Sequence, residues 1–371
     1  MLLKSATDKL LISNQMTSKI LINGNFLCRS LTGIERFAFE TLKNLDEILT
    51  PQDHVSILVP SNAKIIPDYK NIKIIKSPLA ITSFPKWDIF QFKKACKKSG
   101  AVGLNFSNTA PFGKHTGYAF LHDIYGYDCP EDFKNFRSRL IRIYSILHAR
   151  NISHNAKAVF TVSEFSKNQI IKAFKTPSEK IKVIPNGWDH FKSVKCDDSI
   201  FSKFPALKKG DFYFTLGSLQ KRKNLKWIVD YAKNHPEDTF AISGKIVAGY
   251  KSDDISSLND LSNVVLLGYV SDEEVKALMT ACKAFVFPSL YEGFGIPPLE
   301  ALSTGAKIVI SDSASLPEIY RDSAVYINPE NSDCNLSDLL KSECNQNTRK
   351  EVLNTYTYKN AALKLYEALK L

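Results

Sequence analysis

Short apolar runs recur along the chain and alternate with longer segments in which apolar residues return at helical spacing. Most runs are bounded by turn-forming residues, as is typical of strands. We assign strands to residues 19–24, 55–60, 72–75, 118–123, 158–163, 181–184, 212–216, 239–244, 264–270, 284–287, 306–310 and 324–327. Strands that alternate with helices favour parallel sheets covered by helices. The pattern therefore predicts an α/β protein with doubly wound sheets.

The pattern is interrupted near its middle, where Pro185-Asn186-Gly187 ends one half and a polar connector leads to the next strand. This tripeptide is a strong turn signal, and we expect a hinge there. With 371 residues, of which 44% are hydrophobic, the chain can fill two cores. We predict an N-terminal domain over 1–186, a C-terminal domain over 187–354, and a final amphipathic helix over 355–371.

The segment Phe287–Glu300, FPSLYEGFGIPPLE, combines a strand end, a glycine loop and a helix start. Pro297 and Pro298 open the helix, since proline suits a first helical turn. Glu292 in the loop and Glu300 on the helix can face one hydroxyl-rich ligand from two sides. The free N–H groups of a helix start also suit a phosphate. The alternative is a capped turn with two surface glutamates.

A second loop, Gly217–Leu225, follows the strand 212–216 and holds three adjacent cations, Lys221, Arg222 and Lys223. Such a cluster in a strand-to-helix loop indicates an anionic ligand. A diphosphate fits best, because lysine neutralises it as a point charge and arginine binds it as a fork.

Two strand ends in the N-terminal half carry further candidates. Thr32-Gly33 lies between a strand and a helix, where backbone N–H groups can meet a diphosphate. The strand 118–123 ends in His122 and Asp123, at the carboxyl edge where doubly wound sheets bind ligands. His122 is either a site residue or a structural histidine. Asp123 is either an acceptor-side group or a helix cap.

The net charge of +11 is unevenly distributed. Residues 1–190 hold 27 Lys and Arg against 15 Asp and Glu, a net +12, whereas residues 191–371 hold 22 against 23, a net −1. A basic half suits a membrane surface, a lipid-linked phosphate or nucleic acid, and solvated lysines without a partner are the alternative. Because no nucleic-acid motif is recognisable, we do not expect nucleic acid as a partner.

The segment Phe133–Tyr144, FKNFRSRLIRIY, mixes four cations with aromatic and branched residues. A basic amphipathic helix of this kind can lie on an anionic bilayer. The alternative is a helix with a buried apolar face and solvated arginines. The sequence leaves both open.

The seven cysteines are scattered and never spaced as C-x-x-C, so we expect reduced thiols and no zinc site. No apolar run approaches the roughly 20 residues that span a bilayer. Met1–Lys4 lacks the apolar core of a signal peptide. We expect a cytoplasmic protein, with contact at the inner face of the cell membrane if Phe133–Tyr144 binds lipid. Residues 1–18 show no convincing period and are expected to form a loose extension.

The run EGFGIPPLE, continued by ALSTGAKIVIS, resembles the Glu-x7-Glu signature of the retaining glycosyltransferases of family 4. The likeness covers roughly residues 19–371 and is most specific from 212 to 330. A loop at 32–37, TGIERF, resembles that of a branch acting in surface-polysaccharide assembly. The resemblance implies the GT-B fold, in which two Rossmann-like domains face a central cleft and the last helix packs on the first domain.

The resemblance also implies roles for individual residues. The catalytic group would be Glu292 by the donor sugar, Lys223 and Arg222 on the diphosphate, and His122 near the sugar. The other donor-binding positions would be Gly33, Gly217, Ser218, Tyr269, Val270, Gly293, Phe294, Gly295, Ile296 and, on the ribose, Glu300. Arg36 and Asp123 would lie on the acceptor side. Many members have arginine at the position of Ser218, so either Arg222 or Lys221 substitutes for it or phosphate binding is weaker.

The activity that the resemblance implies is transfer of a hexose or deoxyhexose, with retention, from a nucleotide diphosphate sugar to a lipid-linked saccharide in surface-polysaccharide synthesis. We expect neither a metal nor another cofactor, because cations can stabilise the leaving diphosphate and no Asp-x-Asp pair stands at a strand end. The alternatives are a sugar-nucleotide-binding subunit without catalysis and an epimerase or phosphorylase-like enzyme of the same fold. The donor base, the sugar and the linkage stay open.

Overall fold

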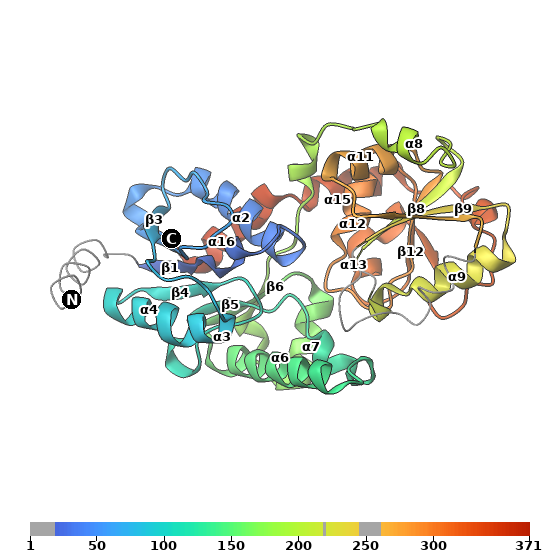
Figure 1. The fold of residues 1–371 in the computed structure, drawn as a ribbon. Helices are drawn as coiled ribbons and strands as arrows, with labels where there is room; N and C mark the ends of the chain where they lie inside the picture. The colour runs from blue at the N-terminus through green and yellow to red at the C-terminus, as the bar shows by residue number, and fades with distance from the viewer. Residues whose placement is uncertain (1–18, 218–219, 245–260) are drawn as a thin grey trace. The chain divides into compact units, whose positions relative to one another are not determined.

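The computed structural model describes residues 19–217, 220–244 and 261–371 (Figure 1). These residues form two compact units. The first contains residues 19–162, Ser166–Pro185 and Tyr358–Leu371, and the second contains Ser163–Phe165 and Asn186–Thr357. The chain therefore leaves the first unit next to the predicted hinge and returns to it at its C-terminal end.

Seven parallel strands form the sheet of the first unit, in the order β3-β2-β1-β4-β5-β6-β7. They are β1 (Ile20–Asn23), β2 (Val55–Val59), β3 (Lys73–Lys76), β4 (Val102–Asn105), β5 (Tyr118–Phe120), β6 (Ala158–Thr161) and β7 (Ile181–Val183). The hydrophobic pattern does not predict β4, because its four residues include a glycine and are too few to stand out. It nevertheless pairs with β1, Ile20 opposite Val102, and forms the centre of the sheet.

Helices cover both faces of this sheet. They are α2 (Ile34–Ile48), α3 (Phe84–Lys86), α4 (Lys93–Ser99), α5 (Tyr125–Asp128), α6 (Phe136–Asn155), α7 (Glu164–Phe174) and α16 (Tyr358–Leu369). Ile20 and Ile22 share a core cluster with residues of α2 and α16, whereas Leu21 between them packs with Cys96 of α4. Since alternate residues of a strand point to opposite faces, this sheet is buried on both sides.

The second unit contains a parallel sheet of six strands among the described residues, in the order β10-β9-β8-β11-β12-β13. These are β8 (Phe212–Leu216), β9 (Thr239–Ser243), β10 (Val264–Gly268), β11 (Ala284–Phe287), β12 (Ile308–Ser311) and β13 (Val325–Ile327). Its helices are α8 (Ser199–Lys203), α9 (Leu225–Asn234), α11 (Asp272–Ala281), α12 (Ile296–Ser303), α13 (Leu316–Tyr320), α14 (Leu336–Leu339) and α15 (Gln346–Thr355). The predicted α/β class with two doubly wound parallel sheets is confirmed.

The last helix, α16, packs on α2 of the first unit (Figure 1). Its Tyr358, Ala361 and Leu365 are fully buried in the same cluster as Phe37 and Leu42 of α2. The spacing of these three residues is helical, so one stripe of α16 supplies the contact.

The helix expected over Phe133–Tyr144 is wrong in its bounds. It begins at Phe136 and runs to Asn155, because Asn135 is its N-cap and accepts a hydrogen bond from Ser138 N at 2.8 Å. A side-chain acceptor at this position satisfies an N–H that the first turn leaves unpaired. The residues before Asn135 therefore lie outside the helix.

Candidate active site

The loop after β11 is held by hydrogen bonds to its carbonyl oxygens. Ser163 donates to Gly293 O at 2.7 Å, Ser315 to Glu292 O at 3.0 Å, and Tyr320 to Gly295 O. All of these donors and acceptors belong to the second unit. The loop is thus a preformed element, and its side chains are presented in a defined direction.

Gly295 has to be glycine for two reasons. Its φ is 88°, and an added Cβ would lie 2.5 Å from Cδ2 of Leu316. Left-handed backbone favours glycine, and the close approach excludes a side chain. Helix α12 then begins at Ile296, with Pro297 in its first turn, which confirms the predicted helix start.

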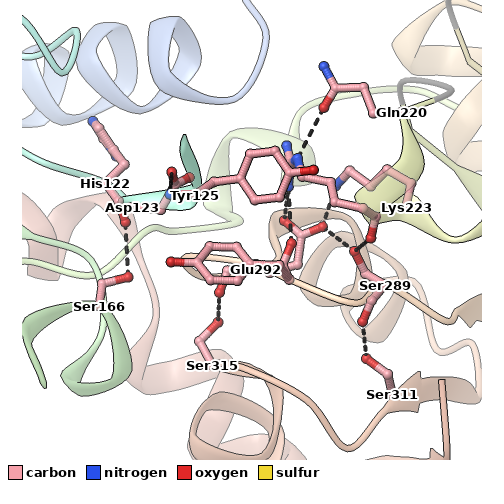
Figure 2. Close-up of polar contacts among 12 residues, drawn as sticks. His122, Asp123, Tyr125, Ser166, Gln220, Lys223, Ser289, Glu292, Ser311 and Ser315 are labelled. Atoms are coloured by element: carbon pink, nitrogen blue, oxygen red, sulfur yellow. Dashed lines mark hydrogen bonds and ion pairs between the residues drawn. The ribbon is translucent and has the colours of Figure 1, made fainter. Parts of the chain in front are cut away.

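Glu292 faces Lys223 of the second loop (Figure 2). Its Oε1 accepts from Lys223 Nζ at 2.5 Å and from Ser289 Oγ at 2.6 Å, and its Oε2 accepts from Arg222 Nη1 at 3.0 Å. The side chain of Glu292 is 8% exposed. The sequence left open that Glu292 and Glu300 are surface glutamates beside a capped turn. That alternative is wrong, because both residues are buried.

Burial by itself would raise the pKa of Glu292. Lys223 and Arg222 oppose this effect, and together with the hydrogen bonds from Lys223 and Ser289 they lower the pKa to about 2. Glu292 is therefore ionised at neutral pH. It can orient a hydroxyl or stabilise positive charge, but it is a poor proton donor.

The loop with the cations is shaped by Asn224 at its end. Lys221–Lys223 form a short 3₁₀ helix, η8, and Asn224 follows at φ 56°. Its side chain donates to Pro288 O at 3.0 Å and to Pro329 O at 2.7 Å. These bonds fix the loop against the end of β11. Gly217 begins the loop, the side chain of Lys223 passes close to it, and Ser218 lies outside the described residues.

Glu300 lies on α12 and meets a residue that the motifs do not single out. Its Oε1 is 3.2 Å from Nε2 of His190, and both side chains are largely buried. His190 belongs to η7 (Asp189–Lys192), a 3₁₀ turn just after the hinge sequence. The only sequence signal was its place three residues after the turn signal Pro185-Asn186-Gly187.

The residues at the end of β10 differ in exposure. Gly268 has φ 67°, and its carbonyl accepts from Ser243 Oγ at 2.9 Å and from Gly244 N at 3.1 Å. Tyr269 is 74% exposed, whereas Val270 is buried. Backbone N–H and C=O groups are thus held at this edge of the sheet, next to an outward-facing ring.

In the first unit, Gly33 stands directly before α2 with φ 43°, and an added Cβ would meet no heavy atom within 4 Å. The backbone around it is therefore approachable. Arg36, one turn further on, donates from Nη2 to Leu31 O at 3.3 Å. Its guanidinium thus contributes to the geometry of the loop that precedes the helix.

His122 is buried at the end of β5. Its backbone N–H donates to Asn108 Oδ1 at 2.8 Å, and its Nε2 lies 2.9 Å from Phe106 O. Since a carbonyl only accepts, Nε2 carries the proton. Burial lowers the pKa of His122 to about 4, so the ring is neutral at pH 7. Asp123 accepts from Tyr125 N at 3.1 Å, a local turn bond just ahead of α5, whose N-cap is Ile124.

Helix α6 exposes apolar side chains among its arginines. Phe136 is 78% exposed, and Leu140, Ile143 and Leu147 are each about half exposed. Their spacing of four, three and four residues places them on one side of the helix. The alternative of a buried apolar face for this segment is therefore wrong. We call Phe136, Leu140, Ile143 and Leu147 the α6 patch.

Two groups of side chains among the described residues have the spacing of metal ligands. They are Cys129 with Glu131 and Asp132, and His235 with Glu237 and Asp238. Neither group includes Glu292 or Glu300.

Two parallel doubly wound sheets in separate units define the GT-B class. Sucrose-phosphate synthase from Thermosynechococcus elongatus shares this fold with a TM-score of 0.71 at 16% identity, over 95% of this chain and 98% of that chain. HepE from Anabaena, in complex with UDP-glucose, shares it with a TM-score of 0.66 at 17% identity, over 95% and 99%. At such identities the likeness concerns the fold alone.

Two family models match separate parts of the chain. The model described as Glycosyltransferase Family 4 matches residues 109–190, and the model described as Glycosyl transferases group 1 matches residues 197–360. Over these two ranges the chain is similar to glycosyltransferases of these two families.

Curated relatives include the O-antigen chain mannosyltransferase B of Escherichia coli, 30% identical over 60% of this chain and 60% of its own. The O-antigen chain mannosyltransferase RfbU of Salmonella typhimurium is 30% identical over 57% and 56%. A UDP-Gal:alpha-D-GlcNAc-diphosphoundecaprenol alpha-1,3-galactosyltransferase of Escherichia coli is 26% identical over 69% and 66%. The chain thus matches less than two thirds of the length of the first two relatives.

Proposed function

We propose that this protein transfers a hexose or deoxyhexose from a nucleotide diphosphate sugar to a saccharide acceptor, with retention of configuration. The observation that carries the proposal is the buried, ionised Glu292 between Lys223 and Arg222. Two cations gathered at the start of a helix suit a diphosphate, and a carboxylate among them suits the hydroxyls of a sugar. The family and the names of the relatives support this reading.

On the donor side, Lys223 and Arg222 would stabilise the negative charge that develops on the leaving diphosphate, together with the N-terminus of α12. Preorganised charge of this kind is a major source of catalysis. Glu292 would orient the sugar and Glu300 the ribose. Gly217, Gly293 and their neighbours would supply backbone groups at close range. With this charge supplied by side chains, we propose that the reaction needs no metal or other cofactor.

In the first unit, the proposed roles are those that the family resemblance implies. Gly33 is assigned to a donor phosphate, His122 to the sugar, and Arg36 and Asp123 to the acceptor side. The neutral ring of His122 makes it unsuited to bind an anion by charge. The uncovered backbone at Gly33 is suited to one.

A panel of UDP, GDP, dTDP and ADP, each with and without an attached sugar, tests the donor site by thermal shift. A ligand that binds only the folded state adds about 2.7 kcal/mol of stability at a hundredfold excess over its Kd. We expect one base to exceed the others and Lys223→Ala to abolish its effect. Absence of any shift, with a shift for nucleic acid instead, would reject the proposal. Binding without turnover on any acceptor would favour a sugar-nucleotide-binding subunit.

For the acceptor, we propose a saccharide on a lipid carrier and contact of the protein with an anionic membrane through the α6 patch. Exposed apolar side chains beside Arg137 and Arg139 form a surface that suits an anionic bilayer. A pocket of about 290 Å³ next to it is lined by Lys134, Arg139 and Arg142, among others. In the part of the chain that the structure describes, no helix is long and apolar enough to cross a membrane.

Sedimentation with lipid vesicles tests this contact. We expect binding to phosphatidylglycerol-containing vesicles and little binding to pure phosphatidylcholine. Replacing Arg137 and Arg139 by Gln should weaken binding by roughly tenfold or more, because each basic residue near an anionic surface contributes about 1 kcal/mol. Leu140→Ser should weaken it as well, while Leu363→Ser, an exposed leucine on α16, should not. Equal binding to both kinds of vesicle would contradict the proposal.

A further inference from the structure

The pair of His190 and Glu300 joins the segment after the hinge to helix α12. Nε2 of His190 lies 3.2 Å from Oε1 of Glu300, and their side chains are 4% and 11% exposed. This is an ion-pair contact between largely buried groups, with the imidazole against one oxygen of the carboxylate. The contact therefore singles out one oxygen of the carboxylate, Oε1, and leaves Oε2 on the other side.

The turn that carries His190 is fixed from two sides. Trp188 Nε1 donates to Leu353 O of α15 at 2.8 Å. From the other side, Lys276 of α11 donates from Nζ to Phe191 O at 2.8 Å and to Val194 O at 2.7 Å. Phe191 is itself buried. The backbone on both sides of His190 is thus anchored to two helices, and the imidazole is held in place against α12.

We propose that His190 is a positioning residue that sets how Glu300 presents its carboxylate to the ribose of the nucleotide donor. This inference rests on the proposed function. A carboxylate has two oxygens and about four acceptor sites. The contact with His190 lies at Oε1 and restrains the rotation of the group. Oε2 then stays available for the hydroxyls of a ribose.

The consequence is a preference for ribose over deoxyribose. A buried carboxylate that is built to accept from a hydroxyl is left unpaired when that hydroxyl is missing, and such sites discriminate strongly. The discrimination depends on the orientation of the carboxylate as well as on its presence. Without His190, Glu300 can turn toward other donors or water, so the penalty for a missing hydroxyl should shrink.

The experiment compares a nucleoside diphosphate with its 2′-deoxy and 3′-deoxy forms by isothermal titration calorimetry. The probe is whichever of UDP, GDP and ADP binds the wild-type protein most tightly. We expect the wild type to bind the ribose form at least about tenfold more tightly than one of the deoxy forms. His190→Ala should reduce this ratio by about fivefold or more and raise KM for the donor, with kcat at saturation changed little.

Two variants serve as controls. His190→Gln can donate from its side-chain amide at a similar reach and should restore most of the ratio. His235 lies at the same distance, 3.2 Å, from Glu237 elsewhere in the same unit, but with the side chains 21% and 66% exposed. His235→Ala should leave the ratio unchanged. If His190→Ala does not fold, His190→Asn, whose amide is too short to reach Glu300, replaces it in the comparison with His190→Gln.

The outcomes separate the inference from the function on which it rests. A wild type that prefers ribose, with the same preference in His190→Ala, would overturn the role of His190 and leave the proposed function standing. A wild type that binds the ribose and deoxy forms equally would also overturn it. If the wild type binds no nucleoside diphosphate, the proposed function fails and the inference fails with it.

Discussion

The substitution Glu292→Gln tests the charge cluster at the centre of the candidate site. It removes one negative charge and keeps the size of the side chain, so Lys223 and Arg222 lose their buried counter-ion. Gln can still accept a hydrogen bond from Ser289 through its amide oxygen. The main change is therefore electrostatic, and the loop that carries the residue should keep its course.

The loss of stability caused by Glu292→Gln follows from the pKa of Glu292. A carboxyl whose pKa falls from 4.5 to about 2 on folding contributes about 3 kcal/mol at neutral pH. Removing one partner of a buried ion pair costs about 3–5 kcal/mol, and the lower end applies here because Lys223 and Arg222 are 16% and 22% exposed. Both routes give a loss of about 3 kcal/mol. Because the folded pKa is the lower one, this stability is complete above pH 4.5 and is lost as the pH falls toward 2.

Urea unfolding from pH 7 to pH 3, followed for the transition that contains the second unit, measures this loss. Glu351→Gln, which breaks the exposed pair with Arg321, is the control and should change stability by less than about 0.5 kcal/mol. We also expect Glu292→Gln to bind a nucleoside diphosphate several-fold more tightly, because Lys223 and Arg222 no longer have to give up a carboxylate partner. The same variant should lower the rate of sugar transfer by at least about a hundredfold. Wild-type stability together with unchanged nucleotide affinity would refute the reasoning.

Three further predictions concern the stability of the two units. His122 has a pKa of about 4 in the folded protein against 6.5 in an unfolded chain, so stability is complete above pH 6.5 and is lost as the pH falls toward 4. His122→Gln should flatten this part of the pH profile of the free energy of unfolding, and an unchanged slope would contradict the prediction. Gly295→Ala should destabilise the protein by about 2–4 kcal/mol, because of the positive φ and the clash of the new Cβ with Leu316. Gly305→Ala, also at positive φ but in open space, should cost only about 1–2 kcal/mol. Equal losses of Tm in the two variants would show that the clash with Leu316 contributes nothing. Leu365→Ala should lower the free energy of unfolding by about 2–5 kcal/mol if α16 stabilises the first unit. The exposed Leu363→Ala is the control. A loss of stability no larger than that of the control would show that α16 contributes little.

Much of the fold was predictable because its signals are local. The strands of the second unit are continuous apolar runs bounded by turn residues, and Pro297 marks the start of α12 without any tertiary information. The strand β4 and the true bounds of α6 were not predictable in this way. A four-residue run with a glycine carries little local signal, and the start of α6 depends on a single cap residue, Asn135.

The sequence by itself determined that this is a two-unit α/β protein and that Glu292 and Glu300 stand on a glycine loop and the helix it opens. Strand and helix periodicity and turn chemistry act over a few residues, so they can be read directly. Only the tertiary structure decided which groups meet across long separations. Lys223 reaches Glu292 across 69 positions, and His190 reaches Glu300 through a turn that two helices anchor. The structure also decided that the α6 patch is exposed, because burial depends on what the rest of the chain packs against a helix, which no periodicity within it can specify.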